Sequence, residues 1–151
     1  MSEPVSQSAC SIRRAGPEDY GGIVEVWVKS GLIVRLTGRE SEAAFRRQLE
    51  HFAELYLVAV DGGRIIGVVF GSHDHRKGWI NRLAVLPEYR GRGVASSLVA
   101  ACEKALRVSG IEIVAALIEP ENTVSCALFE RLGYRNDVPA RYYRKLARPD
   151  I

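Results

Sequence analysis

The chain has 151 residues, of which 47% are apolar, and a formal net charge of +3; this length supports one hydrophobic core, so we expect a single domain over residues 11–148 behind a flexible tail over residues 1–10. Basic and acidic residues are interspersed, which argues against a nucleic-acid surface, and no apolar run approaches the roughly 18 residues of a membrane span. The three cysteines, Cys10, Cys102 and Cys126, are widely spaced and lack metal-ligand spacing, so they favour neither disulfides nor zinc and are typical of a cytoplasmic protein.

The first third of the chain predicts a short strand followed by two helices. Residues 11–15 are expected to form the strand. The stretch Gly16-Pro17-Glu18-Asp19 is typical of a helix start, because proline suits the first turn and acidic residues favour the positive end of the helix dipole. A second helix is indicated by Phe45, Leu49 and Phe52 at helical spacing.

The middle of the chain predicts a meander of three antiparallel strands and then a long helix. Two β-rich apolar runs, residues 56–60 and 65–70, flank the turn signal Asp61-Gly62-Gly63, and residues 79–86 form the third run. Apolar residues from 93 to 107 then recur along one face of a helix.

The last third predicts a strand over residues 111–118, parallel to its neighbour because a helix connects them. Asn122 is expected to cap a further helix that Gly133 ends, and Tyr142-Tyr143 suggests a final strand. The predicted order is β-α-α-β-β-β-α-β-α-β-β, an α/β fold with a mixed central sheet and helices on its faces.

The most informative stretch is the loop Arg90-Gly91-Arg92-Gly93-Val94-Ala95, which joins a strand to a helix start. The first amides of a helix lack internal partners and carry partial positive charge, so they bind anions readily. Glycines let a diphosphate approach those amides, and the arginines add charge-assisted hydrogen bonds. The alternative is an ordinary tight turn, since a lone G-x-G before a helix is often no more than that.

These residues resemble the GNAT acetyltransferase superfamily, whose coenzyme A signature is Q/R-x-x-G-x-G/A at a helix start. Arg90, Gly93 and Ala95 fill its three fixed places. Residues 122–134 are similar to the N-x-x-x-x-x-L-Y-x-x-L-G-F block of that family. Within the family the chain resembles small bacterial members of unassigned acceptor.

The resemblance implies acetyl-CoA as cosubstrate and an amine-bearing small molecule or peptide as acceptor, with no nucleic-acid or membrane partner. A homodimer stays open. Backbone groups of Leu83, Ala84 and Val85 would pair with the pantetheine arm, with Asn122 near that arm and Phe129 near the sulfur. The diphosphate would be held by the loop and helix amides of Arg90, Gly91, Arg92, Gly93, Val94, Ala95 and Ser96.

The catalytic groups depart from the family pattern, because the tyrosine that many members use as general acid is Phe129 here, and a phenyl ring carries no acidic proton. A main-chain N–H near the end of the 79–86 strand suits the developing oxyanion. For proton removal through water we nominate Glu119 and Asn81. The connection over residues 31–40 is the candidate for acceptor contacts.

Three other interpretations remain open. The loss of the tyrosine is compatible with a non-catalytic acyl-CoA sensor. Gly91-x-Gly93-x-x-Ser96 could instead be a dinucleotide fingerprint with Glu112 as ribose acid, although Glu112 opens the next strand rather than ending it. His73 and His75 suggest a metal or a base, but a solvated turn suits their spacing better.

Overall fold

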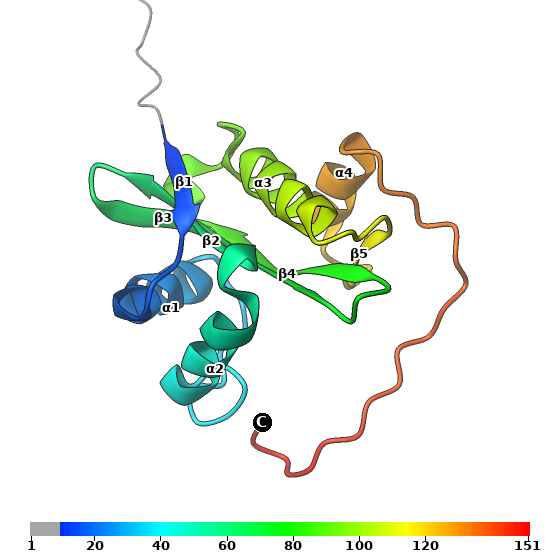
Figure 1. Cartoon of the computed structure of the whole chain (residues 1–151), viewed down its shortest axis with the longest axis horizontal. Coiled ribbons are helices and arrows are strands. Elements are labelled where there is room, and N and C mark those ends of the chain that lie inside the picture. Colours follow the sequence, from blue (N-terminus) through cyan, green and yellow to red (C-terminus); the bar gives the residue numbers. More distant parts are fainter. Residues whose placement is uncertain (1–9) are drawn as a thin grey trace, which may run out of the picture.

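The computed structural model describes residues 10–151, so nearly all of the predicted N-terminal tail lies outside the described residues. The described chain forms strands, α-helices and short 3-10 helices, and Figure 1 shows how they are arranged. The order is β1 (Ser11–Arg14), the 3-10 helix η1 (Pro17–Asp19), α1 (Tyr20–Lys29), α2 (Glu42–Phe52), η2 (Ala53–Leu55), β2 (Tyr56–Asp61), β3 (Arg64–His73), β4 (Gly78–Val85), η3 (Pro87–Tyr89), α3 (Val94–Val108), β5 (Val114–Ala116) and α4 (Thr123–Arg131).

The strands form one sheet in the order β1-β2-β3-β4-β5, antiparallel through β4 and parallel between β4 and β5. Helices α1 and α2 cover one face, and α3 and α4 cover the other (Figure 1). The predicted mixed sheet with helices on both faces is therefore confirmed. None of the helices within residues 10–151 is long and apolar enough to cross a bilayer.

Local sequence signals account for much of this framework. The turn Asp61-Gly62-Gly63 closes the β2–β3 hairpin, with φ of 54° at Gly62 and 82° at Gly63, values that glycine adopts without strain. The apolar stripe of α3 is buried against the sheet. Helix α3 also packs closely on β3, because a Cβ at Gly71 would lie 2.5 Å from the Cys102 sulfur.

The first of the two predicted C-terminal strands is found, parallel to β4 as predicted but shorter than expected, and the second is absent from the described residues. The strand expected over residues 111–118 is confined to Val114–Ala116, and residues 132–151 contain no strand or helix. Tyr142 and Tyr143 are exposed, and basic residues next to them leave no apolar face for a strand to bury. The segment instead returns along the outside of the molecule (Figure 1), and Arg148 Nη2 donates to Thr37 O at 3.0 Å.

Candidate functional site

The edge of β4 is open along its second half. Strand β4 pairs with β3 up to Val85, but with β5 only from Gly78 to Ile80. Beyond Ile80, the residues Asn81 to Val85 have a partner strand on one side only within residues 10–151. An unpaired strand edge offers N–H and C=O groups to an extended ligand, and Leu83, Ala84 and Val85 lie on this stretch.

The loop after β4 presents a row of free amides. Gly91 and Gly93 have φ of 76° and 78°, in the left-handed region that favours glycine. A Cβ at either position would meet no protein atom within 4 Å, so space lies outside the loop. Within the described chain, no protein acceptor receives a hydrogen bond from the N–H groups of Gly91, Arg92, Gly93, Val94, Ala95 or Ser96. The first protein-bonded amide is that of Ser97, which donates to Gly93 O at 3.0 Å.

The two loop arginines have different surroundings. Arg90 Nη2 donates to Ser30 O at the end of α1, at 3.3 Å. The Arg92 guanidinium lies over the Tyr89 ring, 5.1 Å from its centroid, and Tyr89 is itself anchored by a 2.7 Å hydrogen bond to Asp61. Arg92 is exposed beside the free amides and adds positive charge there.

The two residues predicted at α4 have structural roles. Asn122 is the N-cap, and its Oδ1 accepts from Ser125 N at 3.2 Å, as predicted for a cap. Phe129 is 5% exposed and packs edge-on against Tyr134, with ring centroids 4.9 Å apart. Within residues 10–151, no hydrogen-bond partner is found for the buried hydroxyl oxygen of Tyr134, and burial raises the pKa of this phenol.

The two residues nominated for proton removal through water lie in different settings. Asn81 is half-buried in β4, and its Nδ2 donates to Ser72 Oγ at 3.0 Å. Glu119 lies in the exposed connection between β5 and α4, where its backbone carbonyl accepts from Asn122 N at 2.9 Å. No hydrogen bond or ion pair of the Glu119 carboxylate is found within residues 10–151.

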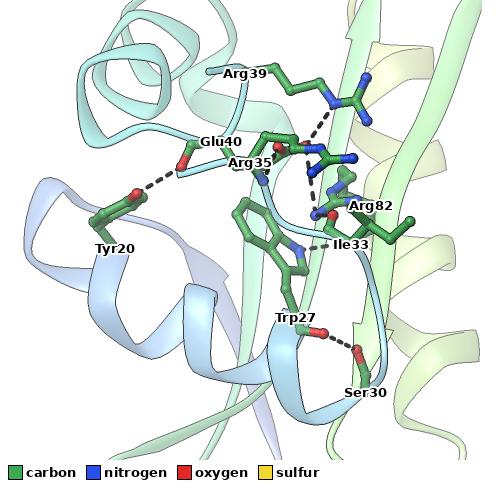
Figure 2. A network of polar contacts seen from close by, with 8 residues as sticks. All are labelled: Tyr20, Trp27, Ser30, Ile33, Arg35, Arg39, Glu40 and Arg82. Atoms are coloured by element: carbon green, nitrogen blue, oxygen red, sulfur yellow. Dashed lines mark hydrogen bonds and ion pairs between the residues drawn. The ribbon is translucent and has the colours of Figure 1, made fainter. Parts of the chain in front are cut away.

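A buried polar network beside β4 was missed at the level of sequence. Glu40 is 7% exposed at the end of the α1–α2 connection. Its Oε2 accepts from Arg35 N at 2.8 Å, its Oε1 accepts from Arg39 Nε at 3.3 Å, and its Oε1 lies 3.7 Å from Arg82 Nη2 (Figure 2). The connection had been nominated for acceptor contacts, but neither Glu40 nor Arg82 was singled out. The available signal was a charged residue, Arg82, among the apolar residues of a buried strand.

Arg82 has an unusual backbone for a strand residue. Its φ is 54°, which costs about 1–2 kcal/mol for a residue with a Cβ. Burial lowers the pKa of its guanidinium, while the charge of Glu40 acts in the opposite direction. The side chain is held over the ring of Trp27, 4.7 Å from the centroid.

His73, His75 and Glu112, which were considered for a metal or base and for a ribose acid, lie outside the segments of the site described above. His73 Nδ1 accepts from His75 N at 3.0 Å, and Asp74 Oδ1 accepts from Lys77 N at 2.8 Å, so these side chains close the exposed β3–β4 turn. No cluster of side chains suited to a metal ion is found in residues 10–151. Glu112 is exposed and precedes β5, which disfavours the dinucleotide interpretation.

Comparison with known proteins gives one family match. Residues 22–134, which run from the first turn of α1 to just beyond α4, match the model of the acetyltransferase (GNAT) family.

Solved structures share the fold. An aminoglycoside N-acetyltransferase, AAC(6')-Iy in complex with CoA, is 23% identical with a TM-score of 0.75, over 93% of this chain and 97% of that one. The PaiA N-acetyltransferase of Thermoplasma acidophilum, in complex with coenzyme A, is 19% identical with a TM-score of 0.75, over 84% and 90%. Naa20 of Chaetomium thermophilum, in complex with a bisubstrate analogue, is 19% identical with a TM-score of 0.67, over 81% and 69%.

Proposed function

Because this chain belongs to the acetyltransferase (GNAT) family, it is an acetyl-CoA-dependent N-acetyltransferase, and we propose that it passes the acetyl group directly to a primary amine of a small molecule or protein. The observation that carries the proposal is the row of free amides from Gly91 to Ser96, next to the one-sided edge of β4. Backbone donors at a helix start, with open space outside, suit a diphosphate.

In this proposal, the amides of Gly91 to Ser96 hold the diphosphate, with Arg90 and Arg92 adding charge. The pantetheine arm then runs along Leu83, Ala84 and Val85 as an additional strand. The cap residue Asn122 lies near the arm, and Phe129 lies near its sulfur end. The thioester is thereby placed at the point where β4 parts from β5.

The transfer is a nucleophilic attack by a neutral amine on the thioester carbonyl. The C–N bond forms, the C–S bond breaks, and the thiolate leaves with the electron pair. An alkylamine has a pKa of about 10.4, so its proton must pass to a base or to water. We propose that Asn81 and Glu119 guide that proton through ordered water. A main-chain N–H at the bend of β4 would stabilise the oxyanion, because a fixed dipole needs no reorganisation.

Cofactor binding is tested by thermal unfolding with acetyl-CoA and with NAD. Acetyl-CoA should raise the melting temperature and NAD should not. Changing Arg90→Ala together with Arg92→Ala should weaken the acetyl-CoA effect. The matched control changes Arg141→Ala and Arg144→Ala, which removes the same charge from the exposed segment beyond α4. An acetyl-CoA shift that is absent in the wild-type protein would contradict the proposal.

Acceptor choice is tested by thiol release from acetyl-CoA with polyamines, amino acids, aminoglycosides and peptide N-termini. The aminoglycosides enter this panel because one similar structure is an aminoglycoside N-acetyltransferase. Release with one amine class identifies the acceptor. We place the reaction in the cytoplasm, which fits three cysteines that are all free thiols. Analytical ultracentrifugation of the active protein distinguishes a monomer from a homodimer.

A second candidate function is favoured by Phe129, which replaces a proton-donating tyrosine with a buried phenyl ring. Here the protein would bind acyl-CoA without transferring the acyl group. Tight CoA binding with no thiol release from any amine in the panel would support this sensor function over catalysis.

A further inference from the structure

The bend of β4 is centred on Arg82. Opposite β3, the residue pairs step from Phe70–Asn81 to Val68–Ala84, so Arg82 and Leu83 face Val69 in a β-bulge. Arg82 is the single non-glycine strand residue with positive φ in the described chain. The bulge begins two residues after Ile80, the last residue of β4 that pairs with β5. The bulge therefore marks the point where the edge of β4 becomes free.

Both ends of Arg82 are held by residues of α1 and of the connection that follows it (Figure 2). The guanidinium lies over the Trp27 ring, and Nη2 donates to Ile33 O at 3.0 Å. The Arg82 carbonyl accepts from Trp27 Nε1 at 3.4 Å. Trp27 is 2% exposed, so its position is set by the core. The strained residue is thus fixed to a rigid part of the molecule.

Glu40 fastens the other end of the same connection. Its carboxylate accepts from the backbone N–H of Arg35 and lies within 3.7 Å of Arg82 Nη2, while its backbone carbonyl accepts from the hydroxyl of Tyr20 at 2.7 Å. The connection between α1 and α2 is therefore tied to the bulge through the buried carboxylate of Glu40 and to the start of α1 through the backbone carbonyl of the same residue (Figure 2). Loss of that charge would leave Arg82 partly buried without its ionic partner.

We propose that Arg82 and Glu40 are positioning residues for acetyl transfer, which hold the α1–α2 connection against the bulge of β4. This inference rests on the proposed function, in which the arm along Leu83 to Val85 ends with its thioester at the bulge. The pair sets the direction of the backbone groups at the bulge and the distance of the connection from the reacting carbonyl. Neither residue belongs to the amides that hold the diphosphate, so the pair governs turnover rather than cofactor affinity.

Three substitutions separate this role from general stability. Arg82→Gly keeps the backbone geometry, because glycine adopts a φ of 54° without strain, and removes the guanidinium. Arg82→Lys keeps the charge without the planar fork, and Glu40→Gln removes the charge with little change of shape. The matched control is Glu42→Gln, the same chemical change at an exposed carboxylate that pairs with Arg46 at 3.2 Å on α2.

Turnover is measured as thiol release from acetyl-CoA with the most active amine among spermidine, L-lysine, neomycin and a peptide with a free N-terminus. CoA affinity is measured by calorimetry. Arg82→Gly and Glu40→Gln should lower kcat at least tenfold, with the KM for acetyl-CoA and the Kd for CoA within threefold of wild type. Arg82→Lys should recover part of the loss, and Glu42→Gln should behave as wild type. Wild-type kcat in both Arg82→Gly and Glu40→Gln, or a loss explained by CoA affinity alone, would overturn the inference.

Hydrogen exchange supplies a readout that does not depend on turnover. In Arg82→Gly and Glu40→Gln, peptides covering residues 31–40 and 81–83 should exchange at least tenfold faster, while α3 should remain as protected as in the wild type. Unchanged exchange in residues 31–40 would show that the pair does not hold the connection, which would also overturn the inference. Failure of the wild-type protein to bind CoA would instead contradict the proposed function.

Discussion

Replacing Gly93 with alanine tests how closely the loop amides approach an anion. Gly93 is the N-cap of α3 and has a φ of 78°. An alanine in the left-handed region costs about 1–2 kcal/mol. A domain of this size loses about 2–4 °C of melting temperature per kcal/mol, so the free protein should melt about 2–8 °C lower.

The added methyl group should also reduce binding of acetyl-CoA. A Cβ at Gly93 meets no protein atom within 4 Å, so the methyl occupies the open space where we place the diphosphate. At one hundred times its Kd, a ligand stabilises the folded state by about 2.7 kcal/mol. A tenfold weaker affinity leaves about 1.4 kcal/mol at the same concentration. The melting shift produced by acetyl-CoA should therefore fall by about half.

Gly110→Ala is the matched control for this experiment. Gly110 has a φ of 83° and the same open surroundings, but it follows the other end of α3. The 15 residues of that helix separate the two sites by about 22 Å. Both variants should lose similar stability in thermal unfolding, and only Gly93→Ala should lose part of the acetyl-CoA shift. A full shift in Gly93→Ala would refute close contact between the loop and the diphosphate.

Three further predictions concern stability and reactivity. Asn122→Ala should lower the melting temperature by about 2–4 °C, because it removes the cap of α4 at a cost of about 1 kcal/mol. Asn122→Ser should retain most of the capping stability, because serine also caps helices. Equal losses of melting temperature in the two variants would exclude capping as the cause. Hydrogen bonds from Arg13 and from Gly16 N hold the pKa of Asp19 below its usual range, so its contribution to stability is present above the unfolded pKa of about 3.9 and is lost as pH falls through the folded pKa. Asp19→Asn should therefore lower the melting temperature at pH 7 and flatten the acid limb of the stability curve, which melting followed by circular dichroism across pH will check. Burial raises the pKa of the Cys102 thiol to about 12, so a thiol reagent should count one more cysteine in denaturant than in the native protein; full native reactivity would contradict its burial.

The features that sequence predicted correctly depend on residues close together in the chain. The hairpin at Asp61-Gly62-Gly63, the apolar stripe of α3 and the α4 cap at Asn122 were all predicted and are all found. A turn, a cap and an apolar helical stripe each depend on residues that are near one another in the sequence, so they can be predicted without knowing the tertiary contacts. The loop between β4 and α3 was placed for the same reason, while its ligand contacts remain predictions.

The parts that were missed depend on contacts between distant residues. Arg82 bonds Ile33 and Trp27, which precede it by 49 and 55 residues. The sequence around Glu40 is typical of an exposed acidic residue. In the structure Glu40 is buried, and the fold brings Arg82 beside its carboxylate. A charged residue in a strand pattern signals that something unusual occurs, but it does not reveal the partner. The strand predicted at Tyr142 and Tyr143 is wrong for a related reason, since these residues have β propensity but no sheet face to cover.

The end of α1 explains how the bulge and the loop between β4 and α3 are held in one arrangement. Ser30 is the C-cap of α1, so its carbonyl shares the partial negative charge of the helix end. Arg90, in the loop between β4 and α3, donates to that carbonyl, and Arg82 of the bulge donates to the carbonyl of Ile33, three residues further on. Arg82 precedes Leu83 to Val85 in the sequence and Arg90 follows them. The guanidinium groups of both arginines are therefore anchored to the short backbone stretch from Ser30 to Ile33. Because that stretch follows directly on α1, whose Trp27 is buried in the core, the position of the free amides relative to the bend of β4 is set by packing of the core.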